Sequence, residues 1–443
     1  MQSSGIATNA WREFWPAFII VVNTIVWYAL NYNVLSSIIQ ETQSLQKDVF
    51  FLGYYLAIAF SAIIGAVLLP RAKKAGLILW MVFGAIMSLV MTTIPSNGDL
   101  INGVIFILSG TSIGIGLPSA LAFFAHRTHI ERRGFLGGIS WTAIGFAILG
   151  FFFVIGIFGT TLGLLTLSIW RFLGLGLFLL LDREGQVAQP INLRNDSYRH
   201  ILGRRDVLLY LLPWIMFSII NFLEAPIIDN LMGELAVTFS FVEFAITGIF
   251  AILGGMFADR IGRKRVVIAG FVLLGMGYAM LSLFFGNPSL WYLWYLYTVL
   301  DGATWGMFAA VFFMALWGDL SLESRKEKYY VLGGLPYLLS GFLPIMIEPY
   351  VGLIQPVMAF SLASFFLFIA VLPLIYAPET LPEKHIKDKE LKTYIEKAQK
   401  MVNKDQEKNR KQNKSAKSSQ GEEPTQQNSE EHEKAKKLAE KYY

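Results

Sequence analysis

The chain has 443 residues, of which 54% are hydrophobic and only 16% are charged, and its formal net charge is +5. This composition leaves too little polar surface for a water-soluble protein of that length, so we expect the chain to lie in a lipid bilayer. The absence of cysteine excludes disulfide bonds, thiolate metal ligands and thiol redox chemistry. The positive charge does not require a nucleic-acid partner, because basic loops and a basic tail that face anionic headgroups account for it.

Twelve segments are apolar over a length close to the roughly 20 residues that one helical crossing of a bilayer needs. We expect transmembrane helices near residues 14–36, 49–69, 77–95, 100–125, 135–157, 162–181, 207–228, 236–257, 266–286, 290–317, 331–352 and 356–376.

The twelve segments fall into two similar sets of six. Pro16 lies early in the first segment, as Pro213 does in the seventh. Internal repeats of this kind predict an all-α membrane protein with twelve helices in two pseudo-symmetric six-helix bundles. We expect an N-terminal bundle over residues 1–182, a cytoplasmic linker over 183–206, a C-terminal bundle over 207–377, and a charged, partly disordered cytoplasmic tail over 378–443.

Basic residues fall in alternate loops, which sets the expected orientation. The loops after the second, fourth, eighth and tenth segments carry Arg71, Lys73, Lys74, Arg127, Arg132, Arg133, Arg260, Arg263, Lys264, Arg265, Arg325, Lys326 and Lys328. The other loops carry almost only Lys47. By the positive-inside rule, we expect a multi-pass protein of the cell membrane with both termini in the cytoplasm.

Residues 255–267 read Gly-Met-Phe-Ala-Asp-Arg-Ile-Gly-Arg-Lys-Arg-Val-Val. This string is similar to the loop signature of the major facilitator superfamily, Gly-x-Leu-Ala-Asp-Arg-x-Gly-Arg-Lys, with Phe257 in place of the Leu. Two further patterns carry the resemblance: Glu131-x-Arg133-Gly134-x-x-x-Gly138 before the fifth helix and Pro378-Glu379-Thr380 after the twelfth. The last is similar to the end of many sugar porters, whereas the family's Pro-Glu-Ser-Pro-Arg after the sixth helix is missing. The resemblance covers residues 10–382 and implies a transporter of the sugar-porter or metabolite-symporter kind.

The turn at residues 255–267 is expected to act as a cytoplasmic gate. Asp259 lies near the C-terminal end of a helix, where a carboxylate is unfavourable unless a cation or another helix N-terminus stands close. Arg263 can supply the cation, and the resemblance implies that the turn faces the start of the fifth helix. The residues expected to form the gate are Gly255, Asp259, Arg260, Gly262, Arg263, Arg132 and Arg133.

The equivalent turn of the first half, residues 65–77, has lost this pattern, since Leu69 and Pro70 replace the family's Asp and Arg. The sequence therefore predicts an asymmetric latch. We expect Glu323 or Glu327 to pair with the basic residues of this turn, Arg71, Lys73 and Lys74, in place of the missing contact.

Ionisable residues at membrane depth are costly and indicate function. Asp301 lies about 16 Å from the outer face, close to the middle of its helix, Glu243 lies roughly 10 Å in, and Glu224 lies toward an outer end. A carboxylate without a cation in a low dielectric can exchange protons near neutral pH. We expect proton coupling through Asp301, with Glu224 and Glu243 as lesser candidates.

Polar and aromatic residues recur at helical spacing and suit a cavity wall for a small organic solute. The alternative is that the Asn and Ser residues among them only join neighbouring helices. The residues expected to contact substrate are Asn23, Trp27, Asn31, Ser218, Asn221, Glu224, Asp301, Trp305 and Tyr337. Arg171 is expected to be an interfacial anchor, with an anionic-substrate ligand as the alternative.

Other chemistry finds no support, because the chain lacks a phosphate-binding Gly-Lys-Ser/Thr loop, and its few histidines, mostly in loops or the tail, form no metal constellation. We expect no enzyme activity, cofactor or metal ion. The sequence favours a proton-coupled symporter of a small organic solute that works by alternating access, functional as a monomer. The alternatives are a facilitative uniporter in which Asp301 binds substrate, and a transporter-like membrane sensor or docking protein that signals through its C-terminal tail.

Overall fold

The computed structural model describes residues 2–42, 46–96, 98–182, 194–233, 235–321 and 324–382, together with Gln399. Residues 384–443 form a separate unit, and apart from Gln399 they lie outside the described residues, as does most of the predicted linker. In the described part the backbone is almost entirely helical, and its β-bridge, between Arg194 and Ser324, is isolated. The prediction of an all-α protein is confirmed.

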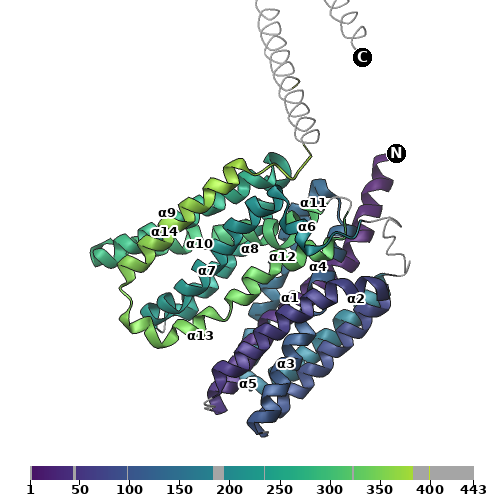
Figure 1. Cartoon of the computed structure of the whole chain (residues 1–443), viewed down its shortest axis with the longest axis horizontal. Helices are drawn as coiled ribbons and strands as arrows, with labels where there is room; N and C mark the ends of the chain where they lie inside the picture. The colour runs from purple at the N-terminus through teal and green to yellow at the C-terminus, as the bar shows by residue number, and fades with distance from the viewer. Residues whose placement is uncertain are drawn as a thin grey trace, which may run out of the picture. The chain divides into compact units, whose positions relative to one another are not determined.

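Fourteen α-helices are described (Figure 1). They are α1 (Gln2–Thr42), α2 (Lys47–Val90), α3 (Asp99–Gly114), α4 (Leu117–Arg127), α5 (Arg133–Leu181), α6 (Tyr198–Leu202), α7 (Arg205–Met232), α8 (Leu235–Ile261), α9 (Arg263–Gly286), α10 (Tyr292–Phe308), α11 (Trp317–Leu320), α12 (Lys326–Ser340), α13 (Leu343–Ile347) and α14 (Pro356–Tyr376). A π-helical stretch, η4 (Ala309–Leu316), joins α10 to α11, and short 3-10 turns are η1 (Met91–Ser96), η2 (Ile130–Arg132), η3 (Pro288–Leu290) and η5 (Glu348–Leu353).

Eleven stretches of the described chain are long and apolar enough to cross a bilayer. One of them is long enough for two crossings. Ile130–Leu181 has 52 residues, which would extend about 78 Å as a straight helix against a hydrocarbon core of about 30 Å. The chain turns back at Gly159, whose φ of 81° suits glycine. After the turn the Trp170 ring packs against Phe151 with centroids 5.6 Å apart. The stretch is therefore a hairpin of two crossings, and the twelve predicted segments are all present.

Two boundaries differ from the expected ones in a way that matters for the site. The tenth crossing continues through α10, η4 and α11 to Leu320, three residues beyond the expected end at residue 317. The eleventh crossing begins at Lys326 rather than near residue 331. Apolar patterning locates the middle of a span well, but charged residues at its ends obscure where the helix stops. As a result, Asp319 belongs to a helix and not to a loop.

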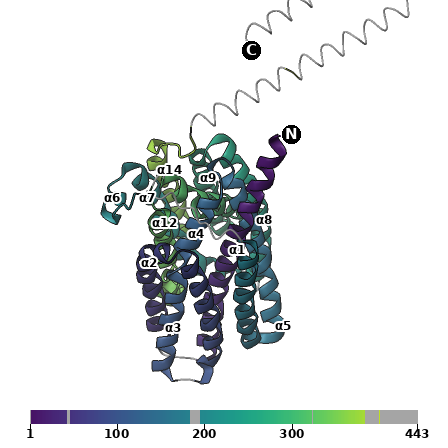
Figure 2. The ribbon, with the colours of Figure 1, turned by 90° about the vertical axis from the view of Figure 1, so that its right-hand side faces the viewer.

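Several helix pairs join the N-terminal half, residues 1–182, to the C-terminal half, residues 207–377, among them α5 with α8 and α2 and α4 with α12. Glycines allow the first contact, since a Cβ on Gly138 would lie 2.2 Å from the carbonyl oxygen of Ala251. We call the end where α5 begins and α8 and α11 end the gate end. We call the other end, with the start of α2 and the last turn of α7, the opposite end. Figure 2 shows the gate end uppermost.

Candidate functional site

A cavity of about 400 Å³ lies between the two halves. Helices α1, α2, α4 and α5 line it from the N-terminal half, and α7, α8, α10, η4 and α12 line it from the C-terminal half. Asp229 and Met232, in the last turn of α7, are among its walls, as is Ser240 near the start of α8. The cavity therefore extends from the middle of the bundle toward the opposite end.

Two carboxyl groups stand together on the C-terminal wall. Glu243 from α8 and Asp301 from α10 both line the cavity, and their helices approach closely there, since a Cβ on Gly302 would lie 3.0 Å from the Glu243 carbonyl oxygen. The Tyr297 hydroxyl donates to Asp301 Oδ2 at 3.2 Å, whereas Asp301 Oδ1 has no donor among the described residues.

The charges of the cavity wall have one sign. Three of the lining residues in the described part of the chain are charged, and all three are acidic: Asp229, Glu243 and Asp301. No lysine, arginine or histidine from the described residues lines the cavity.

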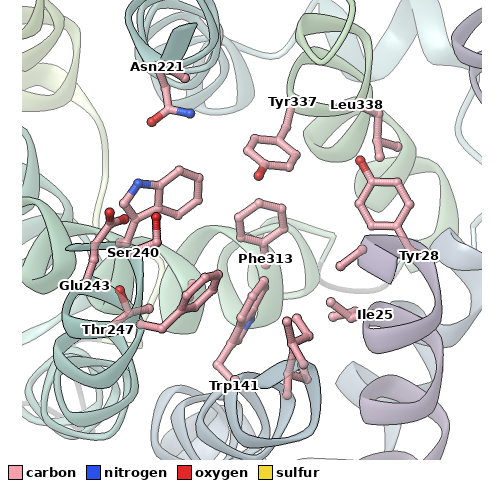
Figure 3. A pocket seen from close by; sticks show the side chains of 18 of the residues that line it. Ile25, Tyr28, Trp141, Asn221, Ser240, Glu243, Thr247, Phe313, Tyr337 and Leu338 are labelled. Carbon is pink, nitrogen blue, oxygen red and sulfur yellow. The ribbon is translucent and has the colours of Figure 1, made fainter. Parts of the chain in front are cut away.

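Aromatic rings cover much of the remaining wall (Figure 3). The Trp141 ring of α5 packs against Phe313 of η4 with centroids 5.2 Å apart. Tyr337 of α12 meets Phe313 edge to face at 5.0 Å and Trp305 of α10 at 5.9 Å. The buried Trp141 Nε1 has no acceptor among the described residues, so this indole offers a donor that the protein itself does not use. Tyr28 of α1 faces these rings from the other side of the cavity (Figure 3).

Five of the residues predicted for substrate or protons line the cavity: Asn221, Glu243, Asp301, Trp305 and Tyr337. Their roles in binding and proton coupling stay predictions. Ser218 and Glu224 of α7 lie outside the cavity lining. The Ser218 hydroxyl donates to the Trp214 carbonyl at 2.8 Å, and Glu224 is buried with its Oε2 lacking a described donor.

The polar stripe of α1 does not reach the cavity, because it faces the other helices of its own half. Trp27 Nε1 donates to Ser88 Oγ at 2.9 Å, and Asn31 Oδ1 accepts from Ser109 Oγ at 2.8 Å. Asn23 donates to the Trp170 carbonyl at 2.6 Å.

These three α1 residues connect neighbouring helices of their own half. This agrees with the alternative stated above for Asn and Ser, that they join helices and do not contact substrate. The cavity instead meets Ile25, Tyr28 and Ala29. Adjacent helical positions differ by about 100° in direction, so a neighbouring residue presents a different face. The apolar and aromatic face of α1, rather than its polar one, lines the cavity.

Arg171 lies inside the N-terminal half, and the expectation of an interfacial anchor is wrong. Its side chain is 0% exposed, and its guanidinium lies 4.4 Å from the Trp27 ring and 4.8 Å from the Trp80 ring. Arg171 Nη1 also donates to Asn23 Oδ1 at 2.9 Å. Indole faces attract a cation, so the two rings stabilise Arg171 without a carboxylate partner. Arg171 does not line the cavity.

At the gate end, Asp259 of α8 binds the beginning of α5 in the other half. Its Oδ1 accepts from the Gly134 amide at 3.0 Å and its Oδ2 from the Phe135 amide at 2.7 Å. The first amides of a helix lack intrahelical acceptors and carry positive partial charge, so a carboxylate satisfies both needs. Arg263, one turn along the chain, forms an ion pair with Asp259. The expected contact between this turn and α5 is present.

The partner of Arg133 is Asp319, which the sequence analysis did not identify. Arg133 Nη1 pairs with Asp319 Oδ1, and Arg263 Nε donates to Asp319 Oδ2 at 3.0 Å. Asp319 lies two residues beyond the expected end of its helix, at a position that the sequence pattern predicts to be a loop. An acidic residue at the end of a long apolar segment, opposite a basic turn, is the signal that could have identified it.

We call the four side chains of Arg133, Asp259, Arg263 and Asp319 the gate network. They are between 0% and 5% exposed, and their formal charges cancel. Such a buried network is stable only while every member keeps its partners. The predicted gate residues Arg132 and Arg260 are exposed and lie outside it.

Glu379, from the Pro-Glu-Thr pattern, closes the turn that follows α8. Its carboxylate accepts from the Arg263 amide at 2.7 Å and the Lys264 amide at 3.2 Å, at the start of α9. Gly262, with φ of 106°, leaves room for this contact, since a Cβ there would lie 2.2 Å from Glu379 Oε2. The pattern thus fixes the backbone that presents Arg263 to the gate network.

The equivalent turn of the N-terminal half pairs within its own half. Lys74 lies 3.0 Å and Arg127 lies 2.9 Å from Asp182, at the end of α5. Glu327 Oε2 has no donor among the described residues, whereas Glu323 and the Lys73 side chain lie outside the part of the chain that the structure describes, so the expected pairing with this turn stays a prediction.

The described end of the linker is held against the start of α12. Ser324 Oγ donates to Asp196 Oδ2 at 2.6 Å, and Lys328 donates to the Asp196 carbonyl at 2.7 Å. Burial alone would raise the pKa of Asp196, but the hydrogen bonds from Ser324 and Arg194 outweigh it and leave that pKa lowered. Asp196 therefore stays ionised at neutral pH and ties the linker to the gate end.

Comparison with known proteins finds a family match to part of the sequence and solved structures of similar fold. A sequence model of the Major Facilitator Superfamily matches residues 204–420. The solved proton:xylose symporter XylE, bound to 6-bromo-6-deoxy-D-glucose, is similar with a TM-score of 0.58 at 18% identity, over 86% of this chain and 97% of that one. The E. coli fucose:proton symporter FucP has a TM-score of 0.58 at 12% identity, over 83% and 98%. A search among curated protein sequences gives no significant match.

Proposed function

We propose that the chain is a membrane transporter of the major facilitator superfamily and moves a small organic solute by alternating access in symport with protons. The observation that carries the proposal is the central cavity, lined by both halves, with the Glu243 and Asp301 carboxyl groups in its wall. Family membership also agrees with the expectation that the chain is a transporter and not an enzyme. XylE and FucP, the structures similar in fold, are proton symporters by name.

The two ends of the bundle support alternating access. The gate network joins the halves at the gate end through buried charges, whereas the opposite end has the exposed ion pair of Lys47 and Glu348. An exposed pair contributes little to stability, while a buried network resists opening. The cavity extends toward the opposite end. Solute would enter there and leave after the gate network separates.

The basic residues of the loops support the orientation. The turns at residues 71–74, 260–265 and 325–328 lie at the gate end, which by the positive-inside rule faces the cytoplasm. We propose that both termini are cytoplasmic, that the protein lies in the cell membrane, and that one copy transports by itself. In this proposal, the closed gate network and the cavity that extends toward the opposite end correspond to an outward-facing state of the cycle.

The carboxyl pair supports proton coupling. Glu243 and Asp301 lie on adjacent helices in the same cavity wall, and no basic side chain of the described residues lines the cavity to hold both of them ionised. A group that binds and releases a proton beside the solute can link the two movements. Glu224 lies outside the cavity lining and is the lesser candidate.

The alternating-access proposal can be tested directly because the chain has no cysteine. Ser240→Cys places a thiol on the cavity wall near the opposite end. In oriented vesicles, a membrane-impermeant maleimide is expected to label it from the outside, and Asp259→Asn is expected to add labelling from the cytoplasmic side. Labelling from one side only in both proteins would contradict the proposal.

Proton coupling is tested in proteoliposomes with a solute found by a thermal-shift screen of sugars, organic acids, amino acids, amines and nucleosides. We expect a proton gradient to drive accumulation, and Asp301→Asn to abolish accumulation while exchange of labelled for unlabelled solute persists. Proton-driven accumulation by Asp301→Asn would show that Asp301 does not couple. Uptake by the unaltered protein that ignores the gradient would favour the uniporter, in which Asp301 binds solute.

A further inference from the structure

We infer that the solute is a monovalent organic cation with an aromatic or apolar body, whose charged group lies at the Glu243 and Asp301 carboxyl groups. The inference rests on the proposed transport function and names the class of its substrate. It follows from the charge, the ring faces and the polar groups of the cavity wall.

The charge of the wall selects against anions. The charged lining residues of the described chain, Asp229, Glu243 and Asp301, are all acidic, and they lie in a partly enclosed space where water screens charge weakly. An organic acid would meet three acidic side chains and no basic side chain of the described residues. An organic cation would instead supply the counter-charge that the carboxyl pair lacks among the described residues.

The rings of the wall suit the same ligand. An aromatic face attracts a cation within about 6 Å of its centroid, most strongly when the rings are shielded from water. Trp141, Trp305, Phe313 and Tyr337 line the cavity, with the Trp141 and Phe313 centroids 5.2 Å apart.

The acidic and small hydroxyl side chains of α8 lie on one side of the wall (Figure 3). Glu243, Ser240 and Thr247 project from α8 on one side, and Ile25 of α1 and Leu338 of α12 lie across from them. A molecule with a charged group at one end and an apolar body fits this division.

A sugar fits the wall less well. Each sugar hydroxyl needs a hydrogen-bond partner when it leaves water, and unmatched hydroxyls cost affinity. The hydroxyl, amide and indole groups of the wall can meet some of them, but a neutral sugar supplies no counter-charge to the carboxyl pair. The similarity to XylE and FucP is a similarity of fold at 12–18% identity. It therefore does not extend to their solutes.

A cationic solute is compatible with proton symport, because the carboxyl pair offers two places. One carboxyl can hold the proton while the other, ionised, pairs with the cation. The carboxyl pair with its proton and its cation then carries no net charge, which lowers the electrostatic cost of moving the loaded halves.

The experiment compares ligands that share one body and differ in charge. The full chain in lipid nanodiscs is titrated with 2-phenylethylammonium, 2-phenylethanol, phenylacetate and D-xylose, followed by calorimetry and by the fluorescence of the lining residues Trp141 and Trp305. We expect the cation to bind about tenfold to a hundredfold more tightly than the alcohol, the range of one charge-assisted contact. Glu243→Gln and Asp301→Asn should each reduce this preference about tenfold and leave the affinity for the alcohol unchanged.

Two controls keep the result interpretable. Asp99→Asn removes the same charge from an exposed position at the start of α3 and should preserve the preference for the cation. Glu243→Asp keeps the carboxylate and should preserve most of the preference. A loss in Glu243→Asp equal to that in Glu243→Gln would show that altered packing, not lost charge, explains the Gln variant, and would overturn the inference.

The inference and the proposed function can fail separately. Equal or tighter binding of phenylacetate, 2-phenylethanol or D-xylose would overturn the cationic substrate even if a proton gradient drives uptake of that ligand. Preferential binding of the cation supports the inference even if no gradient drives its accumulation, in which case the symport proposal fails instead.

Discussion

The two turns at equivalent places in the halves, residues 65–77 and 255–267, use their charges differently. The second turn reaches across the bundle, where Asp259 binds amides at the start of α5 and Arg263 joins the gate network. The first turn has Leu69 at the equivalent position, and its Lys74 pairs with Asp182 of the same half. Near this first turn, Ala62 and Ala66 of α2 pack on Val331 of α12.

At the gate end, charged residues therefore hold α8 to α5, whereas small apolar residues pack α2 against α12. Apolar packing can slide without leaving an unsatisfied group, whereas each separated pair of the gate network leaves a buried charge. We expect α5 and α8 to carry most of the energy that holds the gate closed.

The largest expected effect comes from Asp319→Asn. This change leaves Arg133 and Arg263 as two buried cations without their shared carboxylate. Breaking a buried ion pair from one side costs about 3–5 kcal/mol. We expect a lower unfolding temperature in detergent and easier labelling of gate-end cysteines. If Asp319→Asn unfolds at the temperature of the unaltered protein, the gate network does not stabilise the closed gate.

A smaller effect is expected from Asp259→Asn. The amide keeps one acceptor oxygen, but it loses the charge that Arg263 and the two α5 amides share. A hydrogen bond to a charged group contributes about 1.5–3 kcal/mol. We expect a shift toward a state open at the gate end, measured by accessibility of introduced cysteines on both sides. Unchanged accessibility on both sides would contradict the role of Asp259 as a gate residue.

The matched pair Gly255→Ala and Gly65→Ala sharpens the comparison. A Cβ on Gly255 would lie 2.1 Å from the Gly134 carbonyl oxygen across the halves, and one on Gly65 would lie 1.9 Å from the Ile115 carbonyl oxygen within its half. Overpacking costs about 1–3 kcal/mol in either place. We expect both variants to lower the unfolding temperature and only Gly255→Ala to raise labelling at the gate end. Equal labelling would show that the two turns act alike.

The smallest effect is expected from Lys74→Met. Lys74 is partly exposed, and Asp182 keeps its pair with Arg127 after the change. We expect a loss below about 1 kcal/mol in thermal unfolding and no change in cysteine accessibility. A loss as large as that of Asp259→Asn would remove the distinction between the two turns.

Length and hydropathy were enough to predict the crossings, because a helix of about 20 apolar residues is the stable way to span a bilayer. The motif at residues 255–267 located the turn that binds α5. The sequence did not predict which face of α1 lines the cavity. The polar residues of α1 bond to neighbouring helices, whereas Tyr28 lines the cavity. Polar residues mark either a cavity or a helix contact, and only packing separates the two.

The sequence by itself determined that this is a twelve-helix membrane protein with basic residues at one end and an acidic residue, Asp301, near mid-span. Those features depend on each segment alone, through transfer of side chains from water to lipid. The tertiary structure alone decided that Asp319 joins Arg133 to Arg263, that Glu243 stands beside Asp301, and that Arg171 lies between two indoles. These are pairings between distant segments, and the packing of the helices, not the local pattern of either segment, sets which side chains meet.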